Sequence, residues 1–69
     1  MNTDIIQGKW SKVKGKLRQQ WGKLTDDEIA KMRGTNEELV GRLQETYGYE
    51  KERAQEEINS FIKNNDLDD

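Results

Sequence analysis

The chain has 69 residues and contains no cysteine, histidine or proline, and its twelve basic and fourteen acidic side chains leave a net charge of −2. This composition allows one domain at most, and it excludes a thiolate nucleophile, an imidazole base, a disulfide, a zinc finger and a haem ligand. The longest apolar run is two residues. Because that is too short for a membrane span or a signal segment, we expect a soluble, cytoplasmic protein with no membrane partner.

The N-terminal third of the chain predicts an amphipathic helix from Ile6 to Trp21, because large apolar residues recur there at helical spacing. The stripe is narrow, as expected for a helix with one packing partner. Gly22 follows it, and we expect this glycine to end the helix by adopting a positive φ. Trp10 and Trp21 lie on the stripe, which favours a place in the core over base stacking on the surface. The stripe comprises Ile6, Trp10, Val13, Leu17 and Trp21.

Two capping boxes mark the next helices. Thr25 and Thr35 are each followed three residues later by a glutamate, and an apolar residue comes soon after. This pattern predicts a short helix that begins after Thr25 and ends at Gly34, and another that begins after Thr35 and is closed by Gly48. The carboxylates after Thr25 lack the alternating spacing of a calcium loop, so helix capping explains them better than a cation site.

A fourth helix is predicted from about Glu50 to Lys63, with an N-cap that is weak by sequence. Residues 64–69 are short, polar and acidic, and we expect them to fray as a tail. The predicted fold class is therefore all-α, with four short helices in a single small domain over residues 1–63. Since each apolar stripe must be covered, the helices are expected to form two packed α-hairpins.

The glycines suggest an internal repeat. They form two sets of three with a seven-residue spacing, and the sets are offset by 26 residues. The same offset aligns Leu17 with Leu43 and Trp21 with Tyr47. We interpret the two halves as related hairpins, although helical stripes also resemble one another by chance. The two sets are Gly8, Gly15, Gly22 and Gly34, Gly41, Gly48.

Several short motifs resemble the signature of the CsbD-like family of small bacterial proteins. They are Gly8-x-Trp10, Lys14-Gly15-Lys16, the run WGKLTDD over residues 21–27, Leu39-Val40-Gly41, Tyr47-Gly48-Tyr49 and Ala54. The resemblance covers residues 4–62 and implies a cytosolic bacterial protein associated with general stress or stationary phase. It also implies a compact helical fold with two crossed α-hairpins, as in SAM-like domains. It implies no biochemical activity, catalytic residue or cofactor.

Charge is divided unevenly along the chain. Residues 1–24 carry six basic groups and one acidic group, a net of +5, whereas residues 25–69 carry six basic and thirteen acidic groups, a net of −7. The basic groups of the first helix are a candidate surface for nucleic acid or another anionic partner. The alternative, which we favour, is that they lie beside the acidic helices of the same molecule, because so few phosphate contacts without base-reading side chains bind weakly. The candidate surface comprises Lys9, Lys12, Lys14, Lys16, Arg18, Lys23 and, just past a helix end, Tyr49.

Two hypotheses of function follow. The first is a non-catalytic, stress-associated protein with a protective or structural role through weak contacts. The second is a binding module that uses the basic first helix for nucleic acid or for a regulatory protein. An enzyme is not expected, because the chain is too short to build a cleft and no nucleophile is paired with a base. We expect no cofactor or metal, and a monomer, with a homodimer through the glycine faces as the alternative.

Overall fold

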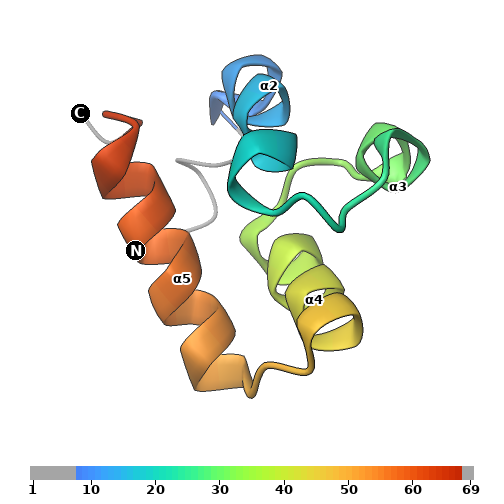
Figure 1. The fold of residues 1–69 in the computed structure, drawn as a ribbon. Coiled ribbons are helices and arrows are strands. Elements are labelled where there is room, and N and C mark those ends of the chain that lie inside the picture. Colours follow the sequence, from blue (N-terminus) through green and yellow to red (C-terminus); the bar gives the residue numbers. More distant parts are fainter. Residues whose placement is uncertain (1–7, 68–69) are drawn as a thin grey trace.

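The computed structural model describes residues 8–67, and every regular element within them is an α-helix. This confirms the predicted all-α class. The predicted start of the first helix, at Ile6, lies outside the described residues. The helices, in chain order, are α2 (Trp10–Gln20), α3 (Asp26–Lys31), α4 (Asn36–Tyr47) and α5 (Lys51–Asn64) (Figure 1).

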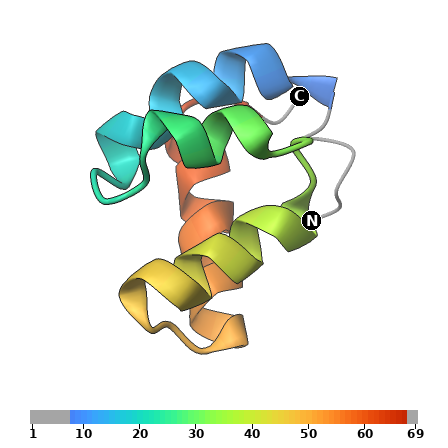
Figure 2. The same ribbon diagram turned by 90° about the vertical axis from the view of Figure 1, so that its right-hand side faces the viewer.

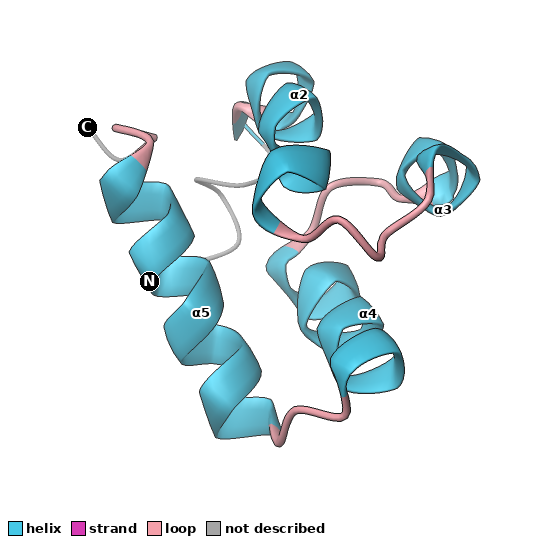
Figure 3. Ribbon diagram, viewed as in Figure 1, coloured by secondary structure: helices cyan, strands magenta, loops and turns pink. Residues whose placement is uncertain are grey.

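The helices form two consecutive hairpins. In both views α2 and α3 lie side by side and run in opposite directions, while α4 and α5 diverge from a shared turn (Figures 1 and 2). Of the helix pairs, α4 and α5 make the most extensive contact. Short loops join the successive helices (Figure 3). The two predicted hairpins are therefore present, and the SAM-like detail of their crossing stays a prediction.

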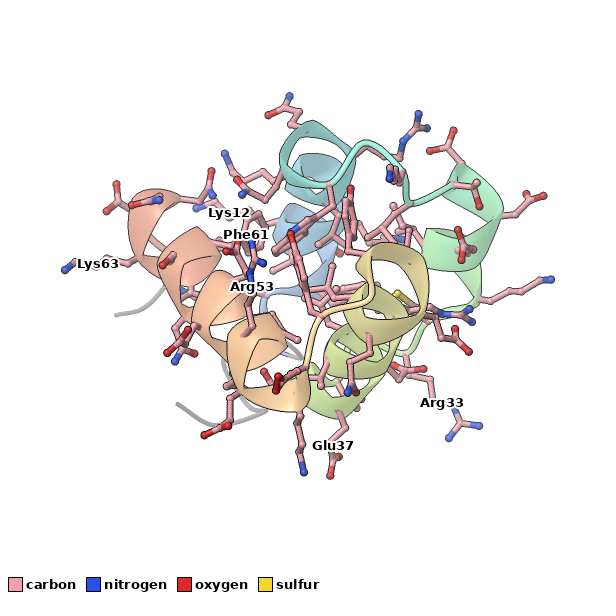
Figure 4. All side chains as sticks on the ribbon, turned by 60° about the horizontal axis from the view of Figure 1, so that its bottom comes forward. Lys12, Arg33, Glu37, Arg53, Phe61 and Lys63 are labelled. Carbon is pink, nitrogen blue, oxygen red and sulfur yellow. The ribbon has the colours of Figure 1, made fainter. Side chains whose placement is uncertain are left out.

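One apolar cluster draws on all four helices. It contains fourteen buried hydrophobic residues, and among the described residues no polar or charged residue is buried with them. Trp21 is only 2% exposed, and its ring centroid lies 5.0 Å from that of Phe61, which confirms its predicted place in the core. Trp10 and Tyr47 are half-buried against the edge of the cluster. Phe61 points between the helices, whereas Lys63 on the same helix points outward (Figure 4).

Both capping boxes form as predicted. The Thr25 hydroxyl accepts a hydrogen bond from the Glu28 backbone N–H at 3.1 Å, and the Glu28 carboxylate accepts one from the Thr25 N–H at 3.0 Å. Thr35 and Glu38 repeat this exchange at 3.2 Å in both directions. Local hydrogen bonding thus sets the starts of α3 and α4. At the start of α5, Glu50 makes no side-chain capping bond, in keeping with the weak N-cap expected there.

The end of the first helix differs from the prediction. Helix α2 ends at Gln20, and Gly22 does not have a positive φ. Instead, the backbone leaves the helix at Trp21, with φ −128° and ψ 85°, while the Trp21 N–H still donates to the helix. Burial of the indole explains this exit, since the chain turns where the ring enters the core. Gly48 closes α4 with φ +72°, as expected.

Helix α3 is also shorter than predicted, because it ends at Lys31 rather than at Gly34. Met32 adopts an extended conformation, with φ −79° and ψ 148°, and its side chain is 6% exposed in the core. Gly34 has φ +95° and lies against the Trp10 ring, so close that a Cβ at Gly34 would be 2.7 Å from two ring atoms. Tertiary packing therefore fixes this segment.

The sequence predicts a tail that frays from Asn64, whereas the structure places the residues up to Leu67 in helix and core contacts. Helix α5 includes Asn64, and Leu67 is fully buried. The Leu67 N–H donates to the Ile62 carbonyl at 2.9 Å, and the Asp66 N–H donates to the Lys63 carbonyl at 3.3 Å. Together with the positive φ of Asp66, 53°, these bonds form a Schellman motif, which turns Leu67 back onto the core. Residues 68–69 lie outside the described residues.

Equivalent positions in the first helices of the two hairpins are buried to the same extent. Val13 and Leu17 in α2 and their counterparts Leu39 and Leu43 in α4 are all fully buried. The third glycine pair differs, because only Gly48 has a positive φ. Duplication stays our interpretation of the sequence pattern.

Candidate functional site

Helix α2 presents three lysines to solvent. Its core face carries Val13 and Leu17, so Lys12 and Lys14 project outward and are exposed, and Lys16 is half-exposed. Within residues 8–67, no ion pair or side-chain hydrogen bond joins any of these three lysines to another side chain. The internal pairing that we favoured from the sequence is therefore not made by Lys12, Lys14 or Lys16. We call these three the α2 lysines.

Arg18, another member of the predicted surface, is engaged inside the molecule. Arg18 Nη1 lies 2.9 Å from Asp26 Oδ1, which ties α2 to the start of α3. Both side chains are well exposed, at 48% and 84%, so this pair contributes less than about 1 kcal/mol. Lys9 is half-buried, and its carbonyl accepts the first bonds of the helix from Lys12 and Val13 at 3.0 and 2.9 Å.

Lys23 and Tyr49 belong to a stack of four side chains. The Lys23 ammonium lies 5.3 Å from the centroid of the Tyr47 ring, and the rings of Tyr47 and Tyr49 are stacked at 5.3 Å. The Arg53 guanidinium carbon then lies 4.4 Å from the Tyr49 centroid. The Lys23 backbone N–H also donates to the Tyr47 hydroxyl at 3.2 Å. These contacts join the loop between α2 and α3 to α4 and α5. The cations and the neighbouring ring cover the ring faces on which a nucleobase would have to stack.

We did not predict from the sequence that Tyr47 and Arg53 would complete this stack. The Tyr47-x-Tyr49 spacing across a helix end and the four-residue spacing from Tyr49 to Arg53 are the signals that point to it. Neither signal is specific, because the turn at Gly48 decides whether the two rings meet. Tyr49 is thus a packing residue between hairpin ends.

Polar contacts hold the second hairpin closed and tie it to the first. Asn36 and Gln55 exchange two amide hydrogen bonds, at 2.7 and 3.0 Å, between the first turn of α4 and α5. Arg42 Nη1 lies 3.6 Å from Glu28 Oε2 of α3 and from Glu45 Oε1 of its own helix. These contacts hold elements together and contain no nucleophile beside a base.

The capping hydrogen bonds also shift the pKa values of the two capping glutamates. Hydrogen bonds from the backbone N–H and the hydroxyl of Thr25 lower the pKa of Glu28 below its ordinary value of 4.5. At Glu38, partial burial raises the pKa, but hydrogen bonds from the backbone N–H groups of Thr35, Arg33 and Gly34 outweigh it, and the net pKa is lowered. Both shifts favour the charged form that capping requires, which is the opposite of a general acid held protonated.

The remaining surface offers little concavity. An open depression of about 520 Å³ on α4 is lined by Glu37 and Arg42 together with Gly41 and neighbouring polar residues. Glu37 and, from the loop before α4, Arg33 both point away from the ribbon in Figure 4. Residues 8–67 contain no group of three or more acidic side chains arranged to hold a metal ion. None of the described helices has the length and apolar character needed to cross a membrane.

Comparison with known proteins places these features in a family. Residues 4–56 match the CsbD-like family. The UPF0337 protein YjbJ of Escherichia coli is 47% identical over 66 residues, which cover 96% of each chain. A UPF0337 protein of Pseudomonas aeruginosa is 51% identical over 88% of this chain and 94% of its own, and one of Pectobacterium atrosepticum is 53% identical over 84% of each. The chain therefore belongs to the CsbD-like family.

Proposed function

We propose that this chain is a small, non-catalytic, cytoplasmic protein associated with stress, which acts through its polar surface in a protective or structural role. One observation carries the proposal: among the described residues, every apolar side chain larger than alanine is buried or half-buried. The outer surface is left to polar and charged groups of both signs, which favours hydration and weak contacts over a defined apolar docking site. The resemblance to stress-associated relatives supports the same function.

The proposed mode of action uses the small size of the core. At about 0.05–0.15 kcal/mol per residue, a domain of this length is stable by roughly 3–10 kcal/mol. Heat or loss of water then shifts part of the population to opened states, in which Trp21 and its neighbours become available to unfolding client proteins. In dilute solution the closed form is a monomer.

The test is protection of an aggregating client protein, followed by light scattering, with Trp fluorescence reporting on opening. Two variants are compared with the wild type, one with a more stable fold and one with a less stable fold. Gly15→Ala lies in mid-helix with nothing within 4 Å of the added Cβ, so it stabilises the fold by about 1 kcal/mol. Leu67→Ala removes a fully buried side chain and destabilises it. Opening predicts that Leu67→Ala protects from a lower temperature and Gly15→Ala from a higher one.

The outcomes separate the parts of the proposal. Equal protection by all three proteins would contradict the opening step and leave a role through bulk presence. A client aggregation rate that does not change at a stoichiometric excess of the protein would contradict the protective role itself.

A second function, binding of nucleic acid by α2, is favoured because Lys12, Lys14 and Lys16 form no ion pair with any side chain of residues 8–67. Neutralising three phosphates predicts that log K falls with log salt with a slope of about −2 to −3. Changing all three lysines to Gln should abolish this slope in a DNA or RNA shift assay. The matched control changes three exposed lysines of other helices, Lys31, Lys51 and Lys63. Equal loss in the control, or no binding at low salt, would refute this function. A regulatory protein that docks on an apolar face has less support, because the part of the chain that the structure describes exposes no such face.

A further inference from the structure

The described part of the molecule has a basic end and an acidic end. Residues 8–24, which include α2, contain six basic side chains and no acidic one. The first two turns of α5 and the residue before them carry Glu50, Glu52 and Glu56, all exposed. Helix α2 and the α4–α5 turn lie at opposite ends of the molecule in two perpendicular views (Figures 1 and 2). Charges at the two ends therefore do not neutralise each other within one molecule.

The two ends carry matching pairs. Lys12 and Lys16 are one helical turn apart on one edge of α2, and Glu52 and Glu56 are one turn apart on one edge of α5. Residues four apart on a helix have Cβ atoms about 5–6 Å from each other, so the spacing of the two pairs is the same. Within residues 8–67, none of these four side chains forms an ion pair. We call them the α2 edge and the α5 edge.

The basic residues near the α5 edge are directed elsewhere. Arg53 lies over the Tyr49 ring and within 4.0 Å of Glu57. Lys51 lines a different depression, between α4 and α5, together with Gln55. Next to the α5 edge, an open depression of about 460 Å³ is lined by all three exposed glutamates, by the hairpin turn and by Arg53. The ion-pair partner of Arg53 there is Glu57, not Glu52 or Glu56. An incoming pair of ammonium groups therefore meets carboxylates that are accessible and not neutralised.

We propose that the α2 edge of one molecule docks on the α5 edge of a second copy, with Lys12 and Lys16 facing Glu52 and Glu56. A second copy fits better than nucleic acid, because the net charge of −2 and the acidic helices repel a polyanion over most of the surface. Each molecule offers both edges, so the contact joins unlike surfaces and does not close on itself. The result is head-to-tail association that grows with concentration and has no fixed stoichiometry.

This association is weak, because it depends on ion pairs at the surface. Exposed ion pairs contribute little each, so molecules are monomeric when dilute and associate only when concentrated or at low salt. Salt screens the contact, since the Debye length falls from about 30 Å at about 0.01 M to about 3 Å at about 1 M. The inference goes beyond the proposed function, because it requires no client protein and no opening of the fold.

The experiment uses charge reversal in the full chain. Apparent mass is measured by static light scattering against protein concentration, at about 0.01 M and about 1 M salt. Lys12→Glu/Lys16→Glu and Glu52→Lys/Glu56→Lys each place like charges at the contact, and we expect each to weaken association about tenfold. The combination of all four changes restores opposite charges at the wild-type net charge, so it should associate as the wild type does.

A matched control separates the contact from net charge. Lys31→Glu/Lys63→Glu changes two exposed lysines elsewhere and alters the net charge as Lys12→Glu/Lys16→Glu does, yet it should keep the association. Circular dichroism checks the fold, and the corresponding Gln variants replace any reversal that fails to fold, with a partial loss expected.

Three results would overturn the proposal. The first is a folded four-fold variant that stays monomeric where the wild type associates. The second is an equal loss in the control variant. The third is a wild type that does not associate at low salt but binds DNA through Lys12 and Lys16, which would assign the α2 edge to nucleic acid.

Discussion

Replacing Gly34 by alanine tests how closely the first hairpin packs on the loop before α4. Gly34 is buried, has φ +95° and lies under Trp10. A Cβ built there would be 2.7 Å from two atoms of the indole and 3.1 Å from the Trp10 Cβ. The substitution therefore introduces two penalties at once, a strained backbone and an overlap with a large ring whose own Cβ is involved.

The expected size can be built from these two parts. A side chain at positive φ costs about 1–3 kcal/mol, and overpacking costs about 1–3 kcal/mol. The lower entropy of alanine in the unfolded chain offsets about 0.4–1 kcal/mol. We therefore expect Gly34→Ala to lose about 2–4 kcal/mol, a large share of the stability of so small a domain. At about 4–8 °C per kcal/mol, the melting temperature should fall by roughly 10–30 °C.

Thermal melts followed by circular dichroism measure this loss, and the other glycines supply the controls. Gly48 has φ +72° with nothing within 4 Å, so Gly48→Ala reports backbone strain without overlap and should cost about 1 kcal/mol. Gly15 has neither feature, and Gly15→Ala should raise the melting temperature. The three substitutions are chemically the same, so their order isolates the environment of each glycine.

A double-mutant cycle with Trp10→Leu identifies the overlap directly. If the ring causes the extra loss, the cost of Gly34→Ala falls toward that of Gly48→Ala once the ring is gone. The reasoning is refuted if Gly34→Ala costs no more than Gly48→Ala, or if the cost is the same with and without the ring.

Three further predictions concern other contacts. Because hydrogen bonds hold the folded-state pKa of Glu38 below its ordinary 4.5, its contribution to stability is complete above that value and is lost as the pH falls through the folded-state pKa. Glu38→Gln should therefore flatten the loss of stability on acidification in urea melts, and an unchanged slope would contradict the cap. The Asn36–Gln55 pair should show a coupling of about 0.5–1.5 kcal/mol in an alanine double-mutant cycle, and strictly additive effects would argue against it. Leu67→Ala should lose about 2–5 kcal/mol in thermal melts, whereas a frayed tail would lose nothing measurable.

The starts of α3 and α4 could be predicted because the relevant physics is local. A threonine and the glutamate three residues later satisfy each other's backbone N–H groups wherever the chain goes next. The apolar stripe was equally informative, since period alone places Val13 and Leu17 on one face of a helix. Both residues are fully buried.

Helix ends were harder because distant contacts decide them. Trp21 leaves α2 to enter the core beside Phe61, and Met32 leaves α3 for the same reason. A nearby glycine suggests that a helix ends there. It does not show at which residue the gain from burying a side chain exceeds the gain from one more helical hydrogen bond. The prediction missed the burial of Leu67, because a single apolar residue hardly changes the polar, acidic composition of the tail. The Schellman pattern, with an apolar residue two positions past the cap, is the signal that identifies it.

The sequence predicted which residues belong to the candidate site, but not which of them form ion pairs. The sequence shows that the first helix is basic and the rest acidic, but pairing depends on which edge of each helix faces a neighbour. Arg18 meets Asp26 because the chain reverses between α2 and α3. Lys12 and Lys16 lie on an edge that no described acidic side chain reaches. That asymmetry between one helix edge and the other is a property of the tertiary structure alone.

Equivalent positions of the two hairpins also diverge in a way that shapes the surface. Trp21 is buried, whereas its counterpart Tyr47 is half-buried and accepts a hydrogen bond from Lys23 through its hydroxyl. A phenol needs a polar partner, so the second hairpin places its ring at the rim and stacks Tyr49 beside it. Arg53 lies over that stack and pairs with Glu57 of its own helix. The tyrosine in the second hairpin thus gives Arg53 partners other than Glu52 and Glu56, and these two glutamates form no ion pair among the described residues.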